Sequence, residues 1–265
     1  MSITPYLWFI ATLILLVLVQ KWIHKHLHGI AYLISRDAEM ALVLYALPLL
    51  PGVALHELSH WLTARALRVK TGDFSIVPRR SADGRVRLGS VQVENVDAFR
   101  TSLIGLAPLV FGSIAVLLIS YLAFGVSSLG EAVQSENIGG VIASLGGVLR
   151  APDAWLWLYL LFVIANAMLP SPADRQTWPP VILFSIIMLV LALMFGWNTA
   201  VEGVGVALGG VLRWLAAAFT IALVVDVPFG LIISLLEPTV SRVTGHAVEY
   251  STDVTEDYSS RRKKR

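Results

Sequence analysis

The stretch LPGVALHELSHWLTA, residues 50–64, places two histidines and a glutamate inside an otherwise apolar run. An α-helix repeats every 3.6 residues, so His56 and His60 stack on one helix face and Glu57 lies beside them. Ionisable side chains are costly inside a membrane and mark functional sites there. The HExxH spacing predicts a helix whose two imidazoles bind one metal ion, with a glutamate adjacent that can accept a proton from bound water.

The composition indicates that this helix lies in a lipid bilayer. Of the 265 residues, 56% are apolar and only 14% are charged, whereas an average soluble domain has about 25% charged residues. Because spanning the hydrocarbon takes roughly 20 mainly apolar residues, we predict an all-α polytopic membrane protein with about six transmembrane helices. The chain has no cysteine, which excludes disulfides, cysteine zinc sites and a thiol nucleophile. The six apolar runs are about 5–23, 40–64, 100–123, 154–172, 179–197 and 213–236.

The distribution of basic residues predicts an orientation, because cytoplasmic loops carry an excess of Lys and Arg. With both termini in the cytoplasm, fifteen of the twenty Lys and Arg residues fall on the inner side, eight of them within 65–100. Lys21 and Lys25, just after the first apolar run, favour the opposite orientation. The majority predicts a multi-pass protein of the plasma membrane with both termini cytoplasmic and no nucleic-acid partner.

In segment 69–95, directly after the HExxH helix, the apolar residues no longer follow helical spacing. Apolar residues alternate in 74–78 and 86–93, on either side of the turn sequence Ala82-Asp83-Gly84-Arg85. This pattern around an Asp-Gly turn predicts a β-hairpin. Farther along the chain, apolar residues at helical spacing in 138–149 predict a helix that lies in the membrane interface.

A catalytic zinc site needs a third protein ligand and an open position for water. The apolar runs hold no further histidine apart from the tract His24, His26 and His28, which we interpret as a polar helix edge. The remaining ligand candidates are therefore acids. Asp174 follows a proline-broken segment at the end of the fourth run, on the same side of the membrane as the end of the HExxH helix, while Asp226 in the sixth run is its rival as ligand or relay.

These motifs together resemble those of the site-2 protease family of intramembrane zinc metalloproteases. The resemblance covers roughly residues 40–180. It rests on the HExxH motif, on the Asn/Pro-rich segment 166–174 that ends in an aspartate, and on 102–112, which is similar to the family's Gly-Pro helix. A β-hairpin after the HExxH helix also suits the family. The chain has Arg175 where relatives usually have glycine.

The resemblance assigns roles to five residues. It implies that His56, His60 and Asp174 are zinc ligands and that Glu57 is the general base. It also implies that Asn166 lies near the active site and helps to hold the substrate. The expected cofactor is Zn²⁺, and the expected partners are the lipid bilayer and a membrane-protein substrate with a transmembrane helix.

The expected domain organisation follows from these assignments. A transmembrane helix and loop occupy 1–38, and a protease-like core occupies 39–180. Two more transmembrane helices occupy 181–236, and a basic cytoplasmic tail occupies 237–265. The expected function is zinc-dependent endoproteolysis of transmembrane segments.

Two other functions remain open from the sequence. The chain is alternatively a catalytically inactive protease-like scaffold or assembly subunit, which the substitution at Arg175 favours and the intact HExxH motif disfavours. A transporter that uses Asp226 and Glu57 as proton carriers is the third alternative. Transporters often have paired broken helices in two halves, and the sequence gives little support for such a repeat.

Overall fold

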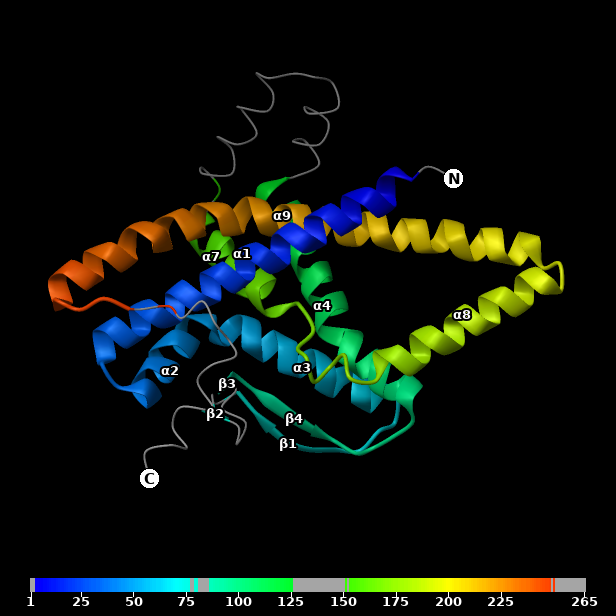
Figure 1. The fold of residues 1–265 in the computed structure, drawn as a ribbon, viewed down its shortest axis with the longest axis horizontal. Helices are drawn as coiled ribbons and strands as arrows, with labels where there is room; N and C mark the ends of the chain where they lie inside the picture. Colours follow the sequence, from blue (N-terminus) through cyan, green and yellow to red (C-terminus); the bar gives the residue numbers. More distant parts are fainter. Residues whose placement is uncertain are drawn as a thin grey trace, which may run out of the picture.

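The computed structural model describes residues 3–76, 79–80, 86–125, 151, 153–248 and 250, and they are mainly helical (Figure 1). The expected interfacial helix at 138–149 and the turn at 82–85 lie outside the described residues. The elements are α1 (Thr4–Ser35), α2 (Ala38–Ala46), the 3-10 turn η1 (Leu47–Leu49), α3 (Leu50–Ala66), β1 (Thr71–Ser75), β2 (Arg79–Arg80), β3 (Val86–Arg87), β4 (Ser90–Val93), α4 (Ala98–Phe124), α7 (Ala154–Ala167), α8 (Trp178–Met194) and α9 (Asn198–Thr244).

Among the described residues, four helical segments are long and apolar enough to cross a membrane. They are Thr4–Ser35, Ala38–Ala66, Ala98–Phe124 and Asn198–Thr244. The other two expected spans correspond to α7 and α8, whose 14 and 17 residues fall short of the roughly 20 that a straight crossing needs. The expectation of a helical membrane protein is confirmed in this form, whereas the count of six spans is not.

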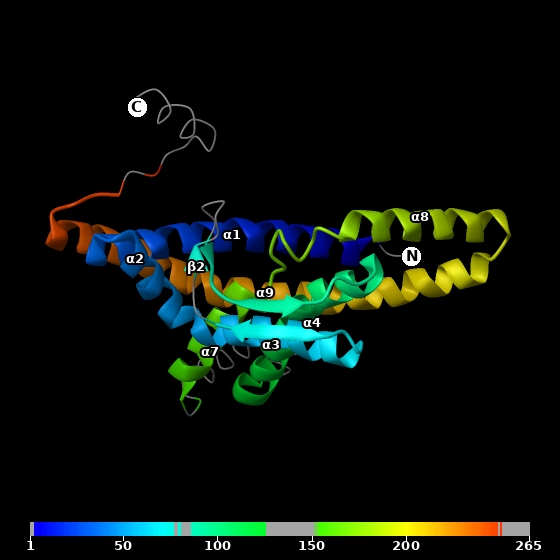
Figure 2. The same ribbon diagram turned by 90° about the horizontal axis from the view of Figure 1, so that it is seen from below.

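The first and last long helices lie side by side and run in the same direction (Figures 1 and 2). Near their starts the Tyr6 hydroxyl donates to the Gly205 carbonyl at 3.5 Å, and near their ends the Arg36 guanidinium donates to the Thr244 carbonyl at 2.8 Å. Two parallel helices that both cross a bilayer begin on one side and end on the other. The expectation that both termini face the cytoplasm is therefore not supported.

The core lies where α7 packs against α3, α4 and α9, and side chains of α1 complete it. Leu16, Val163 and Phe219 are fully buried there, one from each of α1, α7 and α9. Gly52 brings α3 into direct contact with α7, because a Cβ atom at this position would collide with the Val163 carbonyl. This contact holds α3 against α7 at Gly52, one helical turn before His56, the first metal-ligand candidate.

A β-hairpin follows α3, as the alternating pattern predicts. β1 and β4 pair antiparallel, with Phe74 opposite Val91 and Ser75 opposite Ser90. β2 and β3 continue the pairing toward the turn. The hairpin lies alongside α3 (Figure 2), so β4 borders the polar face of that helix.

Candidate metal centre

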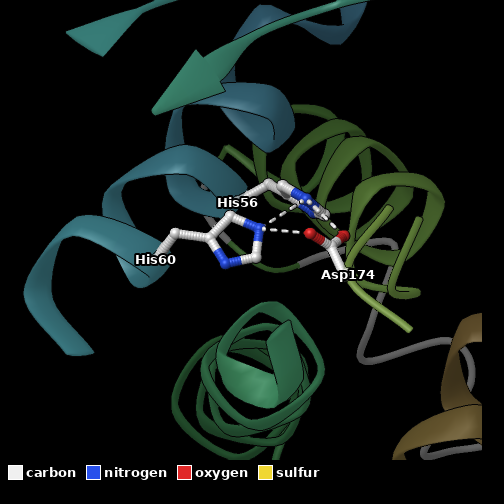
Figure 3. A group of neighbouring side chains, drawn as sticks. All are labelled: His56, His60 and Asp174. Carbon is white, nitrogen blue, oxygen red and sulfur yellow. Dashed lines mark hydrogen bonds and ion pairs between the residues drawn. The ribbon is translucent and has the colours of Figure 1, made fainter. Parts of the chain in front are cut away.

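Three side chains converge from α3 and from the loop between α7 and α8 (Figure 3). The His56 and His60 Nε2 atoms are 3.2 Å apart, and the Asp174 carboxylate oxygens lie 3.3 Å from His60 Nε2 and 3.7 Å from His56 Nε2. Ligand atoms placed at roughly 2.05 Å from a tetrahedral zinc ion are about 3.3 Å apart. The separations therefore match those that one tetrahedral metal ion requires.

The His56 ring is oriented by the end of α7. Its Nδ1–H donates to the Ala167 carbonyl at 2.6 Å. Ala167 is the last residue of α7, and the last carbonyls of a helix have no partner within it. Because Nδ1 carries the proton, the lone pair of Nε2 is directed at the centre.

The His60 ring is oriented by a proline in α4. Its Nδ1–H donates to the Ile104 carbonyl at 2.8 Å. This carbonyl would normally accept from the N–H of residue 108, but Pro108 has none. The proline therefore frees a backbone acceptor inside α4, and that acceptor holds the His60 ring with its Nε2 toward His56 and Asp174.

The donor set itself indicates that the centre fits a cation. In this tautomeric state the two Nε2 lone pairs of His56 and His60 face each other, with the Asp174 carboxylate beside them. Three electron-rich atoms at these distances repel one another unless a cation lies among them. Two imidazoles and a carboxylate suit zinc and other divalent transition metals, so these residues can hold such an ion.

Asp174 is fixed by its own loop and by a glycine in α4. The Ser171 N–H donates to Asp174 Oδ2 at 2.7 Å, and the Asp174 N–H donates to Ser171 Oγ at 3.3 Å. Gly105 lets the loop approach, because a Cβ atom there would collide with the Asp174 carbonyl. These contacts hold the carboxylate beside the two imidazoles, where it can bind a cation.

Glu57 lies in the same cavity as the three ligand candidates, a space of about 1130 Å³. Its side chain is 7% exposed and packs against Gly89, the residue that precedes β4. A Cβ atom at Gly89 would lie 2.6 Å from Glu57 Cγ and 2.8 Å from Oε1. Only a glycine allows the hairpin to cover the glutamate this closely.

Asn166 and Asp226 lie together beside the centre rather than in it. The buried Asn166 amide donates to the Phe162 carbonyl at 2.9 Å and to Asp226 Oδ1 at 2.7 Å. Asp226 is fully buried and is not part of the group formed by the two histidines and Asp174. Asn166 does line the cavity, so its expected role in holding the substrate stays a prediction.

The end of α7 is held by side chains from two other helices. Gln20 donates to the Ala165 carbonyl at 2.8 Å, and His24 Nε2 donates to the Asn166 carbonyl at 3.2 Å. His56 donates to the next carbonyl, as described above. Three consecutive carbonyls at the helix end thus each accept from a side chain of another helix, and α1 supplies two of the donors. His24 acts here as a structural donor between helices, which agrees with the interpretation of its tract as a polar edge.

Some residues of the site were not predicted. Ser171 and Asp174 form the S-x-x-D pattern of a reciprocal cap, and Pro108 inside an apolar run predicts a freed carbonyl, so both carried a signal in the sequence. Gly89 carried none, because its role depends on a contact with Glu57 across the tertiary structure.

No protein-family model, curated protein or solved structure matches the chain. The assignment of function therefore rests on the motif and on the geometry of the centre.

Proposed function

We propose that the protein is a zinc-dependent intramembrane endopeptidase of the site-2 protease type, which cleaves transmembrane segments of other membrane proteins. The observation that carries this proposal is the convergence of His56, His60 and Asp174, with Glu57 in the same cavity, between helices that are apolar enough to cross a membrane. A histidine pair oriented by two backbone carbonyls, with a glutamate next to it in the sequence, has no evident packing purpose.

The residues of the cavity divide the chemistry of peptide hydrolysis among them. His56, His60 and Asp174 would hold zinc, which when bound lowers the pKa of water and polarises a peptide carbonyl. Glu57 takes a proton from the attacking water and returns it to the leaving amine. Its burial under Gly89 keeps the carboxylate at a fixed position relative to the histidines.

A substrate helix must unwind before cleavage, since its carbonyls are engaged in hydrogen bonds. β4 pairs with β1 along one edge, and its residues Ser90, Val91 and Val93 line the cavity. We propose that the second edge of β4 holds the unwound substrate as an added strand. Backbone pairing of this kind tolerates many sequences.

The proposal extends to the location of the centre. We place the protein in the plasma membrane, with the β-hairpin on the cytoplasmic side. The eight basic residues within 65–100 support this orientation. A reporter inserted near Asp83 should report the cytoplasm, and an external signal would contradict this orientation.

The test separates the metal ligands from the base. Purified protein should contain about one zinc ion, and His56→Ala and His60→Ala should each lose it. Glu57→Gln should keep the zinc but lose cleavage of a transmembrane test substrate, because a neutral amide accepts no proton. Glu202→Gln, an exposed glutamate on α9, is the matched control and should cleave like the parent. Full cleavage by Glu57→Gln would contradict the mechanism.

A further inference from the structure

One face of α1 forms a wall of the cavity that contains the metal centre, and its character changes along the helix. The residues that line the cavity recur every three or four positions, which places them on a single face. The first three are apolar and the others are polar or basic. They are Phe9, Leu13, Val17, Gln20, Lys21, His24, Lys25 and His28.

The change from apolar to basic lies level with the metal centre. Gln20 donates to the Ala165 carbonyl and His24 to the Asn166 carbonyl. The next carbonyl, of Ala167, accepts from the metal-ligand candidate His56. A segment of chain lying along α1 would therefore meet apolar side chains on one side of the centre and basic ones on the other.

The basic part of the wall carries two permanent charges. The Lys21 and Lys25 side chains are exposed, and the Lys25 ammonium lies 4.4 Å from the centroid of the Tyr250 ring. His24 adds no charge, because its Nε2–H donates to a carbonyl while its Nδ1 accepts from the Tyr45 hydroxyl at 2.7 Å. Lys21 and Lys25 are therefore the permanent positive charges that this stretch of α1 contributes to the cavity.

The position of the lysines in the membrane agrees with this polarity. A helix rises 1.5 Å per residue, so α1 is about 48 Å long, while the hydrocarbon core is about 30 Å thick. The core accommodates roughly 20 residues of α1, which places Lys21 and Lys25 toward the membrane surface when its apolar first half is immersed. Charged residues that flank a substrate's transmembrane segment lie at the same depth.

We propose that this wall selects the substrate class, namely transmembrane segments whose apolar run is flanked by a cluster of acidic residues. The inference rests on the proposed function and names the substrates of that same site. The apolar run lies against Phe9, Leu13 and Val17, and the flanking carboxylates lie near Lys21 and Lys25. A basic flank is repelled by the same two charges.

Binding of peptides to the Glu57→Gln variant tests the proposal without catalysis. Three labelled peptides share one apolar run and carry an Asp/Glu, an Asn/Gln or a Lys/Arg flank, and their dissociation constants are measured in phosphatidylcholine nanodiscs. The acidic peptide should bind about tenfold more tightly than the neutral one, a difference of about 1.4 kcal/mol. Adding Lys21→Glu and Lys25→Glu should reverse the order, whereas Lys70→Glu, an exposed lysine outside the cavity, should leave it unchanged.

Several outcomes would overturn the proposal. Equal binding of the three peptides would mean that this face of α1 does not select peptides by the charge of their flank. An acidic preference that survives both lysine reversals would mean the same. The nanodisc measurement is repeated with phosphatidylglycerol included. If the lysine reversals act only there, and equally on all peptides, the lysines bind lipid headgroups rather than substrate.

Cleavage by the parent enzyme distinguishes this inference from the function on which it rests. Cleavage of all three peptides at one rate, abolished by Glu57→Gln, leaves the endopeptidase in place and overturns the selection. Zinc-loaded parent protein that cleaves none of them, nor any other transmembrane segment, overturns both.

Discussion

Replacing Pro108 with alanine tests whether a backbone carbonyl of α4 sets the orientation of a metal ligand. In a regular helix the N–H of residue 108 bonds to the carbonyl of residue 104. In this protein that carbonyl, of Ile104, instead accepts from His60 Nδ1 at 2.8 Å. Alanine would supply the missing N–H, which competes with the imidazole for the carbonyl. We expect His60 to lose its fixed orientation and zinc binding to weaken.

The magnitude follows from the bond that is lost. Groups that orient a metal ligand typically contribute 10–100-fold to metal affinity, which corresponds to about 1.4–2.7 kcal/mol. Unfolding should respond differently. A proline inside a helix costs about 3 kcal/mol, whereas removing part of the buried Pro108 ring costs about 0.8 kcal/mol per methylene. The variant should thus bind zinc more weakly while its resistance to unfolding is unchanged or increased.

The assay is a competition for zinc between the purified protein and a chelator of known affinity, together with thermal unfolding of the metal-free protein. Pro238→Ala is the matched control, because Pro238 is also inside a helix but is exposed in α9, away from the centre. It should leave the zinc affinity unchanged. If Pro108→Ala holds zinc as tightly as the parent, the Ile104 carbonyl does not orient His60 for binding.

Three further predictions concern the same centre. Asp174→Ala should bind zinc far more weakly than the parent, since only two ligands remain, whereas Asp226→Ala should keep its zinc; metal analysis of both proteins checks this, and the opposite result would exchange their roles. Gly89→Ala should retain zinc but lower the cleavage rate, because the new Cβ atom displaces the Glu57 side chain; an unchanged rate in a peptide-cleavage assay would show that this contact is dispensable. Removing zinc with a chelator should lower the unfolding temperature, because a ligand at 100 times its dissociation constant stabilises a fold by about 2.7 kcal/mol; the chelator should have no such effect on His60→Ala, and an equal shift there would place the metal elsewhere.

The parts of the site that depend on local pattern could be predicted from the sequence. The spacing of His56 and His60 fixes their place on one helix face whatever surrounds it, and the alternation in 86–93 specifies strands around a turn. Asp174 could be proposed because the prolines before it end a helix on the same side of the membrane. The structure brings these three side chains within ligand distance of one another.

The parts that depend on tertiary contact could not be predicted. In the sequence Asp226 is a rival to Asp174 as the third ligand, and the structure places Asp226 on Asn166, outside the group formed by His56, His60 and Asp174. The six-span count is not confirmed, because apolar runs do not reveal where a helix stops. α7 ends at Ala167, and the residues after it leave the helix and carry Asp174 toward α3. The parallel arrangement of α1 and α9 arises from packing over about 200 residues of sequence separation, as in the bond from Tyr6 to Gly205.

The end of α7 also constrains the order in which the protein is made. Gln20 and His24 are synthesised some 145 residues before the carbonyls that they bond, and His56 is synthesised 111 residues before Ala167. Until α7 has been inserted, the His56 ring lacks the carbonyl that fixes its proton, and Asp174 has not yet been synthesised. The HExxH helix is therefore synthesised before its site can form. For the proposed endopeptidase, metal loading would then be a late event in biogenesis, after α7 and Asp174 are in place.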